Sequence, residues 1–184
     1  MNRNNNMTEN FLANLVLAPY LIKASALIGV ERKIGGNQFR HAIMTLGILL
    51  DYKITDYQLL KASLIHDLIE DIPNTDINEL RLLDEDGNEV VDLVLEVSRR
   101  PGEEKPVFLN RILESGSIKS QMLKTADRIS NLLDLQLGFF TEQKITEYLD
   151  ETEKYVVPMA KNVNSDMLFE IQDLIQKRRK MISH

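Results

Sequence analysis

The sequence predicts an all-α fold, a single helical bundle, and three observations support this prediction. Apolar residues recur mostly at helical spacing, strong alternation of apolar and polar residues is missing, and the chain has only 8 glycines and 5 prolines. A chain of 184 residues has the length of one domain and can bury a core without disulfides. We therefore expect a flexible tail at residues 1–9 and a single domain at residues 10–184.

The first part of the chain is predicted to form three long helices. The first spans about 11–30, with a bend or its start at Pro19 as alternatives, and ends at the turn Lys33-Ile34-Gly35-Gly36, because glycines terminate helices. The second covers 38–51. The third begins at Thr55, whose hydroxyl suits an N-cap, and continues to Asp71, two residues before a proline.

Shorter helices are expected at 76–83 and 89–99, with a turn at residues 84–88 between them. The pair Asp86-Gly87 in this turn is also typical of hairpins, so a short β-hairpin over 83–91 is an alternative. A further helix begins at Pro106, because proline suits the first helical position. The last three helices are predicted at 118–137, 141–161 and 165–182.

Composition and charge exclude several classes of protein. Cysteine is absent, which excludes disulfides, thiolate nucleophiles and cysteine-based metal sites. A net charge of −6, no tryptophan and 6% aromatic residues argue against a nucleic-acid partner. The sequence has neither an apolar run of about 18 residues nor the features of a signal peptide. We expect a cytoplasmic protein with no membrane partner, and the sequence leaves a homo-oligomer open.

The end of the chain carries a basic run at residues 177–180. We interpret it as a solvated helix end, where cations offset the helix macrodipole. The alternative is a patch that binds an anion or a partner.

One segment concentrates ionisable groups in an otherwise apolar predicted helix. Residues 64–71 include His66, Asp67, Glu70 and Asp71. Burying such groups without partners is costly, so they need a metal ion or partners from other helices. His66 and Glu70 are four residues apart, as are Asp67 and Asp71, so each pair would share a helix face.

Two other helices offer side chains that would complete a metal site. His41 lies among apolar residues of the second helix, and Asp127 lies in the apolar helix at 118–137. His41, His66, Asp67 and Asp127 would supply two nitrogens and two oxygens, which suits Mn²⁺, with Fe²⁺ or Zn²⁺ as alternatives. A metal with open positions binds a phosphate oxygen and acidifies water. The structural alternative is four unrelated polar residues of the core.

The order H…HD…D on helices resembles the HD phosphohydrolase superfamily. Residues 66–71 resemble the HDxxED motif of the hydrolase domain in RelA/SpoT-type alarmone enzymes, and residues 124–131 resemble its K-x-A-D-R-x-x-N segment. Residues 32–35 resemble its RKSG turn, and residues 151–160 its E-T-x-x-x-Y-A-P-L-A helix. The resemblance spans about 24–161. The chain is therefore similar to small, hydrolase-only (MESH-like) members, and we expect an HD-domain bundle without a synthetase domain.

The resemblance implies an activity and a role for each candidate residue. The activity is Mn²⁺-dependent removal of pyrophosphate from the 3′ position of (p)ppGpp, a small-molecule nucleotide substrate. The resemblance implies that His41, His66, Asp67 and Asp127 bind the metal and that Glu70 and Asp71 position or deprotonate the attacking water. It also implies contacts to the nucleotide by Arg32, Lys33, Asn131, Lys124 and Arg128.

Several of these residues also have a purely structural interpretation. Arg32 and Lys33 follow a predicted helix, where cations offset the dipole. Glu70 and Asp71 are also suited to capping turns or to pairing with Arg128, and Asn131 to a buried hydrogen bond.

The segment after Asn131 departs from the family pattern. It reads Leu132-Leu133-Asp134-Leu135 where the family commonly has M-R-T-L, so Asp134 replaces a threonine expected near the nucleotide. An acid there would disfavour a nearby phosphate and favour a sugar or base donor. Two alternative functions therefore stay open, an HD phosphohydrolase for another nucleotide and a catalytically silent nucleotide sensor.

Overall fold

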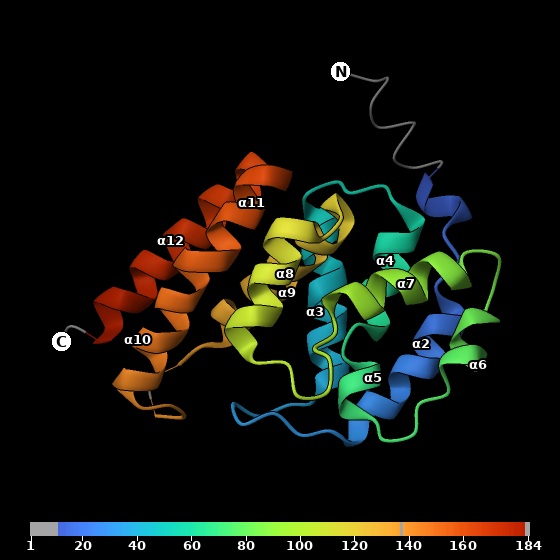
Figure 1. Ribbon diagram of the computed structural model, residues 1–184, viewed down its shortest axis with the longest axis horizontal. Helices are drawn as coiled ribbons and strands as arrows, with labels where there is room; N and C mark the ends of the chain where they lie inside the picture. The colour runs from blue at the N-terminus through green and yellow to red at the C-terminus, as the bar shows by residue number, and fades with distance from the viewer. Residues whose placement is uncertain (1–10, 137, 183–184) are drawn as a thin grey trace.

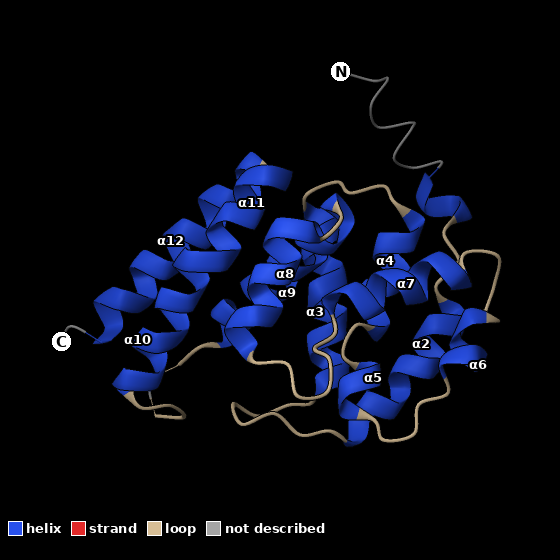
Figure 2. Cartoon of the chain, viewed as in Figure 1, coloured by secondary structure: helices blue, strands red, loops and turns tan. Residues whose placement is uncertain are grey.

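The structure is a computed structural model that describes residues 11–136 and 138–182. Within these ranges the chain is built of helices and loops, as Figure 2 shows, and none of these residues lies in a β-strand. One isolated antiparallel bridge pairs Glu31 with Asn37. The predicted all-α class is confirmed. The predicted tail at 1–9 lies outside the described residues.

The helices follow one another with short loops (Figure 1). After a helical turn at residues 11–14, the first half contains α2 (Ala18–Ala24), the 3₁₀ helix η1 (Ser25–Gly29), α3 (Gln38–Asp51), α4 (Tyr57–Ile65), α5 (Leu68–Asp71), α6 (Ile77–Arg81) and α7 (Gly87–Val97). The second half contains α8 (Lys105–Ser115), α9 (Ile118–Asp134), α10 (Glu142–Glu151), the π-helical segment η2 (Thr152–Val156), α11 (Val157–Val163) and α12 (Ser165–Ile182).

Helix α9 lies at the centre of the bundle. It packs against α3, α4 and α7 toward one flank and against α11 and α12 toward the other, as Figure 1 shows. Leu123, Ala126, Ile129 and Leu132 on α9 are fully buried, at the spacing of one helix face. Polar residues on this helix are therefore held in place by the core itself. No helix among the described residues is long and apolar enough to cross a membrane.

The first predicted helix is interrupted near Pro19, where the sequence allowed a bend or a start. Residues 15–17 form a link, and α2 begins at Ala18, with Pro19 in its first turn. Proline lacks an N–H group and is tolerated only in the first turn, where that donor has no helical partner. At the other end the chain tightens into the 3₁₀ helix η1 before the loop at 31–37.

The third predicted helix is also divided, into α4 and α5, with His66 and Asp67 between them. The His66 Nδ1 atom donates to the Ser63 carbonyl oxygen over 2.8 Å, so a side chain competes with the backbone for this acceptor. His66 therefore lies outside α5, the helix that contains Glu70, and the two residues do not belong to one continuous helix as predicted. Asp56, not Thr55, caps α4, and its carboxylate accepts from the Leu59 N–H at 2.9 Å.

The alternative of a β-hairpin over 83–91 is wrong, because α7 begins at Gly87 within it. Val90, Val91, Val94 and Val97 are buried at helical spacing, and this burial favours a helix. A Cβ atom at Gly87 would lie 2.4 Å from the Arg81 carbonyl oxygen. Close packing against α6 therefore explains this glycine better than a hairpin turn does.

The final helices depart from the predicted ranges at two points. The helix predicted at 118–137 ends at Asp134, because Leu135 is already extended. The predicted helix at 141–161 contains the π-helical segment η2, followed by Pro158 in the first turn of α11. The missing N–H of Pro158 interrupts the α-helical hydrogen bonds there, and a π-type turn accommodates the change. Helices α3 and α12 have the predicted bounds.

Two arginines of the basic run at 177–180 make contacts within the fold. Arg178 donates from Nε to the Leu132 carbonyl oxygen over 2.9 Å and from Nη2 to that of Leu133 over 2.8 Å. Arg179 pairs with Asp150 and Glu153. The run lies at the end of α12, as predicted. Arg178, however, offsets the partial negative charge at the C-terminal end of α9 and not that of its own helix.

Candidate active site

Helices α3 and α9 and the turn between α4 and α5 bring His41, Asp127 and His66 together at the centre of the bundle. The Nε2 atom of His41 lies 3.0 Å from Oδ1 of Asp127, and the Nε2 atom of His66 lies 3.9 Å from the same oxygen. All three residues are at least 94% buried. Asp67 completes the group, with Oδ2 at 3.6 Å from Nε2 of His41 and 3.4 Å from Nε2 of His66.

Hydrogen bonds to the far side of each imidazole fix its orientation. Nδ1 of His41 lies 2.9 Å from Ser130 Oγ, and Nδ1 of His66 donates to the Ser63 carbonyl. His66, which donates through Nδ1, presents a lone pair at Nε2, the usual arrangement of a metal-binding histidine. Without a cation, Nε2 of His41 donates to Asp127; Ser130 can accept from Nδ1 of His41 when a cation takes the place of that Nε2 hydrogen.

The Nε2 atom of His66 is buried and has no hydrogen-bond partner among the described residues. Buried polar atoms are nearly always paired, so an unpaired nitrogen beside two carboxylates needs an explanation. A divalent cation supplies one, because it would accept this lone pair together with those of His41, Asp67 and Asp127. The donor set therefore fits a divalent metal ion.

The charges around Asp127 favour its ionised form. Burial by itself would raise the pKa of Asp127, but Lys124 Nζ at 2.7 Å from Oδ2 and the hydrogen bond to His41 outweigh it. The pKa of this carboxyl consequently lies well below its usual range. For Lys124, burial acts to lower the pKa and the Asp127 charge outweighs that effect, so the pKa is raised. Both groups are therefore charged near neutral pH.

A chain of hydrogen bonds connects this cluster to the loop at 31–37. The Asn131 amide nitrogen donates to Asp127 Oδ1 over 2.6 Å, and its amide oxygen accepts from Arg32 Nη2 over 2.7 Å. The loop is tight, with Gly35 and Gly36 at φ of +85° and +74°, values that glycine adopts without strain. The loop therefore holds Arg32 against α9.

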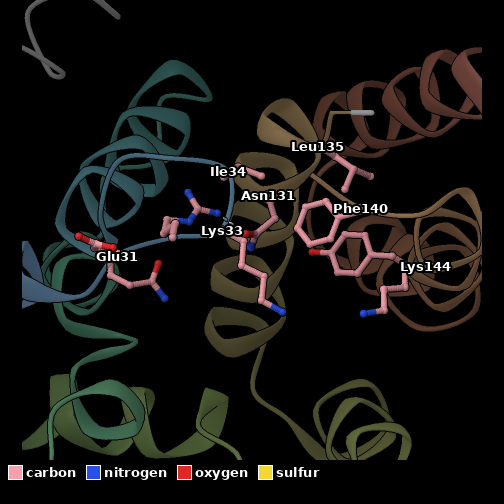
Figure 3. Close-up of a pocket in the computed structure, with 10 residues that line it drawn as sticks. Glu31, Lys33, Ile34, Asn131, Leu135, Phe140 and Lys144 are labelled. Atoms are coloured by element: carbon pink, nitrogen blue, oxygen red, sulfur yellow. Dashed lines mark hydrogen bonds between the residues drawn. The ribbon is translucent and has the colours of Figure 1, made fainter. Parts of the chain in front are cut away.

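Two adjoining cavities open at the cluster. The smaller, of about 240 Å³, is lined by His41, Asp67 and Asp127 together with the cations Arg32, Lys105, Lys124 and Arg128. The larger, of about 390 Å³, is lined by apolar and aromatic groups, namely Ile34, Leu135, Phe140 and Tyr148, and by several polar residues. Figure 3 shows Lys33 and Lys144 extending toward each other across the larger cavity. Arg32, Gln38, Asn131 and Tyr148 line both cavities.

This arrangement joins a cavity with a mostly apolar wall, which Lys33 and Lys144 also line, to a cavity lined almost entirely by polar and charged side chains. Anionic groups are stabilised where cations converge, and flat apolar groups where aromatic rings line a wall. A ligand with a ring system at one end and phosphates at the other would match both spaces.

No protein-family model matches the chain. It is similar to two proteins named guanosine-3′,5′-bis(diphosphate) 3′-pyrophosphohydrolase MESH1. The Drosophila melanogaster protein is 28% identical over 131 residues, which cover 68% of this chain and 71% of that protein. The Xenopus tropicalis protein is 31% identical over 107 residues, which cover 56% and 59%.

A solved structure is also similar, at a TM-score of 0.76 and 25% identity, over 88% of this chain and 94% of the other. It is described as a metazoan orthologue of SpoT that hydrolyses ppGpp and plays a role in starvation responses. In sequence and in fold the chain is therefore similar to HD-type, MESH-like hydrolases. The resemblance inferred from the sequence motifs is thereby confirmed.

The structure separates the two acids that were expected to act together. Asp71 is partly buried, accepts from Gln38 Nε2 over 2.7 Å, and interacts electrostatically with Asp67, His66 and His41. Burial raises the pKa of Asp71, and the nearby Asp67 charge adds to this effect. Glu70 instead is exposed and accepts from the Arg99 backbone N–H over 2.9 Å, beside the loop at 98–104.

Arg128 was expected to contact the nucleotide, but its guanidinium contacts mainly other side chains of this protein. Its guanidinium donates to Thr152 Oγ1 over 2.7 Å and to Glu151 over 2.8 Å, and it lies 4.2 Å from the centre of the Tyr148 ring. Arg128 still lines the smaller cavity. Its position is therefore compatible both with a structural role and with a ligand contact.

Several residues of the site were missed at the sequence level. Ser130 lies three residues after Asp127 on one helix, a spacing that was available as a signal. Other missed residues reach the cavities only through tertiary packing and carry no local motif: Gln38, Lys105, Phe140, Lys144 and Tyr148.

Proposed function

We propose that this protein hydrolyses guanosine 3′,5′-bis(diphosphate), ppGpp, to GDP and pyrophosphate, and that Mn²⁺ is its cation. The buried, unpartnered Nε2 atom of His66 beside His41, Asp67 and Asp127 carries this proposal, because it favours a cation next to a cationic cavity. The activity named for the similar proteins supports the choice of substrate.

His41, His66, Asp67 and Asp127 would hold the cation. When bound, it supplies positive charge that polarises the attacked phosphoryl group and makes water more acidic. The 3′-diphosphate would enter the smaller cavity, where Lys105 and Lys124 stabilise charge on its oxygens. The guanosine would occupy the larger cavity beside Phe140 and Tyr148.

Asp71 is the side chain best suited to take the proton from water. Burial raises its pKa, which strengthens the carboxylate as a base. The water oxygen bonds to the phosphorus attached to the ribose 3′ oxygen, the bond between them breaks, and the 3′ oxygen takes up a proton. Glu70 would act less directly, since its hydrogen bond to Arg99 holds the loop at 98–104 next to the site.

Arg32, Lys33 and Asn131 would contact the nucleotide between the two cavities. Arg32 and Asn131 line both cavities, and Lys33 lines the larger one. A guanidinium stacks on a ring or donates paired hydrogen bonds, whereas an ammonium acts as a point charge.

The test is product analysis of the purified protein with ppGpp and Mn²⁺, and with a chelator as control. We expect GDP and pyrophosphate, with loss of both in chelator and in the His66→Ala and Asp67→Ala variants. Arg179→Ala, a change in ion pairs remote from the cavities on α12, is the matched control and should keep full activity. Full activity of Asp67→Ala would overturn the metal assignment.

A panel of nucleotides and cations, with Fe²⁺ and Zn²⁺ beside Mn²⁺, then separates the alternatives. Orthophosphate released from another nucleotide, without turnover of ppGpp, would indicate a different HD phosphohydrolase. Tight binding of ppGpp by metal-loaded protein without turnover would indicate a sensor.

A further inference from the structure

Asp134 is the last residue of α9 and lies beside the loop that carries Arg32. Its Oδ2 atom is 2.8 Å from Arg32 Nη1, and its Oδ1 atom is 3.8 Å from Arg40 Nη2. The Asp134 side chain is only 14% exposed and that of Arg32 only 12%. The pair is therefore largely shielded from water. A buried ion pair is stable only when its hydrogen-bonding geometry is good.

An aspartate is electrostatically unfavourable at this end of a helix. The C-terminus of a helix carries partial negative charge, which disfavours an acid there. Arg178 supplies positive charge there, but it donates to the carbonyls of Leu132 and Leu133. Asp134 consequently depends on Arg32, and a residue that breaks a local rule in this way points to a role in function.

The guanidinium of Arg32 is held from two sides. Nη1 pairs with Asp134, and Nη2 donates to the amide oxygen of Asn131 over 2.7 Å. Arg32 lines both cavities, so it stands at the boundary between the two. A guanidinium fixed in advance loses less side-chain entropy when a ligand binds.

We propose that Asp134 is a positioning residue that acts through Arg32, holding its guanidinium at the boundary of the two cavities so that its remaining N–H groups meet the nucleotide in one orientation. The Asp134 carboxylate also offsets the positive charge of Arg32. Arg32 therefore recognises the ligand more by the direction of its N–H groups than by its net charge. This inference rests on the proposed function for its kinetic consequence. Its structural part does not.

The structural part is tested by the ¹⁵N and ¹H signals of the Arg32 guanidinium, assigned by their loss in Arg32→Lys. In the wild type, slow rotation should give resolved Nη signals. In Asp134→Ala they should broaden into one exchange-averaged signal, and Asp134→Asn, which keeps an oxygen acceptor, should be intermediate. Unchanged signals in Asp134→Ala would overturn the proposal whether or not ppGpp is a substrate.

The kinetic part is tested with a double-mutant cycle on ppGpp hydrolysis. Asp134→Ala should raise KM about tenfold, the effect of losing roughly one charge-assisted hydrogen bond, and change kcat less than twofold. In an Arg32→Ala background the same substitution should have no further effect, because Asp134 acts through Arg32. Additive effects would overturn the proposal. No turnover by the wild type would instead reject the proposed function and leave the NMR result standing.

Arg178→Ala is the matched control for a loosened helix end. It removes the donor to Leu132 and Leu133 without contacting Arg32, so it should lower the thermal midpoint and leave KM within twofold of the wild type. Asp134→Ala should raise KM, and any fall in its thermal midpoint should come from the unpaired Arg32 and not from the helix dipole. If both variants raise KM equally, Asp134 is only a structural residue.

Discussion

The Nε2 atom of His41 lies 3.0 Å from Oδ1 of Asp127, although the two residues are 86 positions apart in the chain. The packing of α3 against α9 creates this proximity, and both helices are anchored by apolar residues on their buried faces. The geometry of the proposed metal site therefore depends directly on the hydrophobic core. A substitution that shifts one of these helices is expected to affect cation binding before it unfolds the protein.

His66→Ala should abolish stabilisation by the cation. A ligand that binds only the folded state stabilises it by about 2.7 kcal/mol at a concentration of 100 times Kd. We expect Mn²⁺ to raise the thermal midpoint of the wild type and to have no effect on His66→Ala, because Nε2 of His66 is a free donor for the cation. Asp92→Ala, at a side chain 68% exposed on α7, should respond like the wild type. An equal rise in His66→Ala would show that the cation binds elsewhere.

Ser130→Ala should weaken cation binding without removing a ligand. Ser130 Oγ lies 2.9 Å from His41 Nδ1, and groups that orient a metal-binding histidine typically contribute about 10–100-fold in affinity. Isothermal titration with Mn²⁺ measures the effect. Ser120→Ala is the control, because Ser120 is also buried on α9 but its hydroxyl donates to the Ser117 carbonyl. Equal affinities in the two variants would contradict the role given to Ser130.

Much of the fold was predictable because local signals and burial agree. Helix α3 begins at Gln38 because the Asn37 side chain accepts from the Arg40 N–H at 2.9 Å, and its apolar spacing continues to Asp51. The division between α4 and α5 was not predictable in this way. It accompanies a bond from the His66 ring to the backbone, which no periodicity reveals.

The same contrast applies to the candidate site. His66, Asp67 and Asp127 were recognisable because charged groups in apolar helices demand compensation. The contact between Arg32 and Asp134 spans 102 positions and involves a residue at a helix end where local electrostatics disfavour it. Only tertiary packing shows that Asp134 pairs with Arg32, where the sequence alone indicated an acid that would disfavour a phosphate.

Arg128→Met should destabilise the protein strongly. The Arg128 side chain is 3% exposed and pairs with Glu151, 17% exposed, while its guanidinium also donates to Thr152. Removing one partner of a buried pair typically costs about 3–5 kcal/mol. Urea unfolding measures the change. Arg179→Met, which removes a more exposed cation from Asp150 and Glu153, should cost less than about 1 kcal/mol. Similar losses in the two variants would contradict the structural role of Arg128.

Glu103→Gln should make stability less sensitive to acid. Glu103 accepts from Arg111 Nε over 2.8 Å, and this hydrogen bond is the main reason that its pKa falls from 4.5 to about 2. A carboxyl with a lowered pKa in the folded state stabilises the protein above the unfolded pKa, and this contribution is lost as pH falls from about 4.5 toward 2.

Urea midpoints measured at several pH values through this window test the role of Glu103. The wild type should lose stability more steeply than Glu103→Gln, because glutamine takes up no proton. Glu114→Gln, an exposed position on the same helix as Arg111, controls for the general effect of removing an acid. If the slope of Glu103→Gln equals that of the wild type, the Glu103–Arg111 pair does not hold the loop at 98–104 in solution, because a broken pair leaves the carboxyl with the pKa of the unfolded chain.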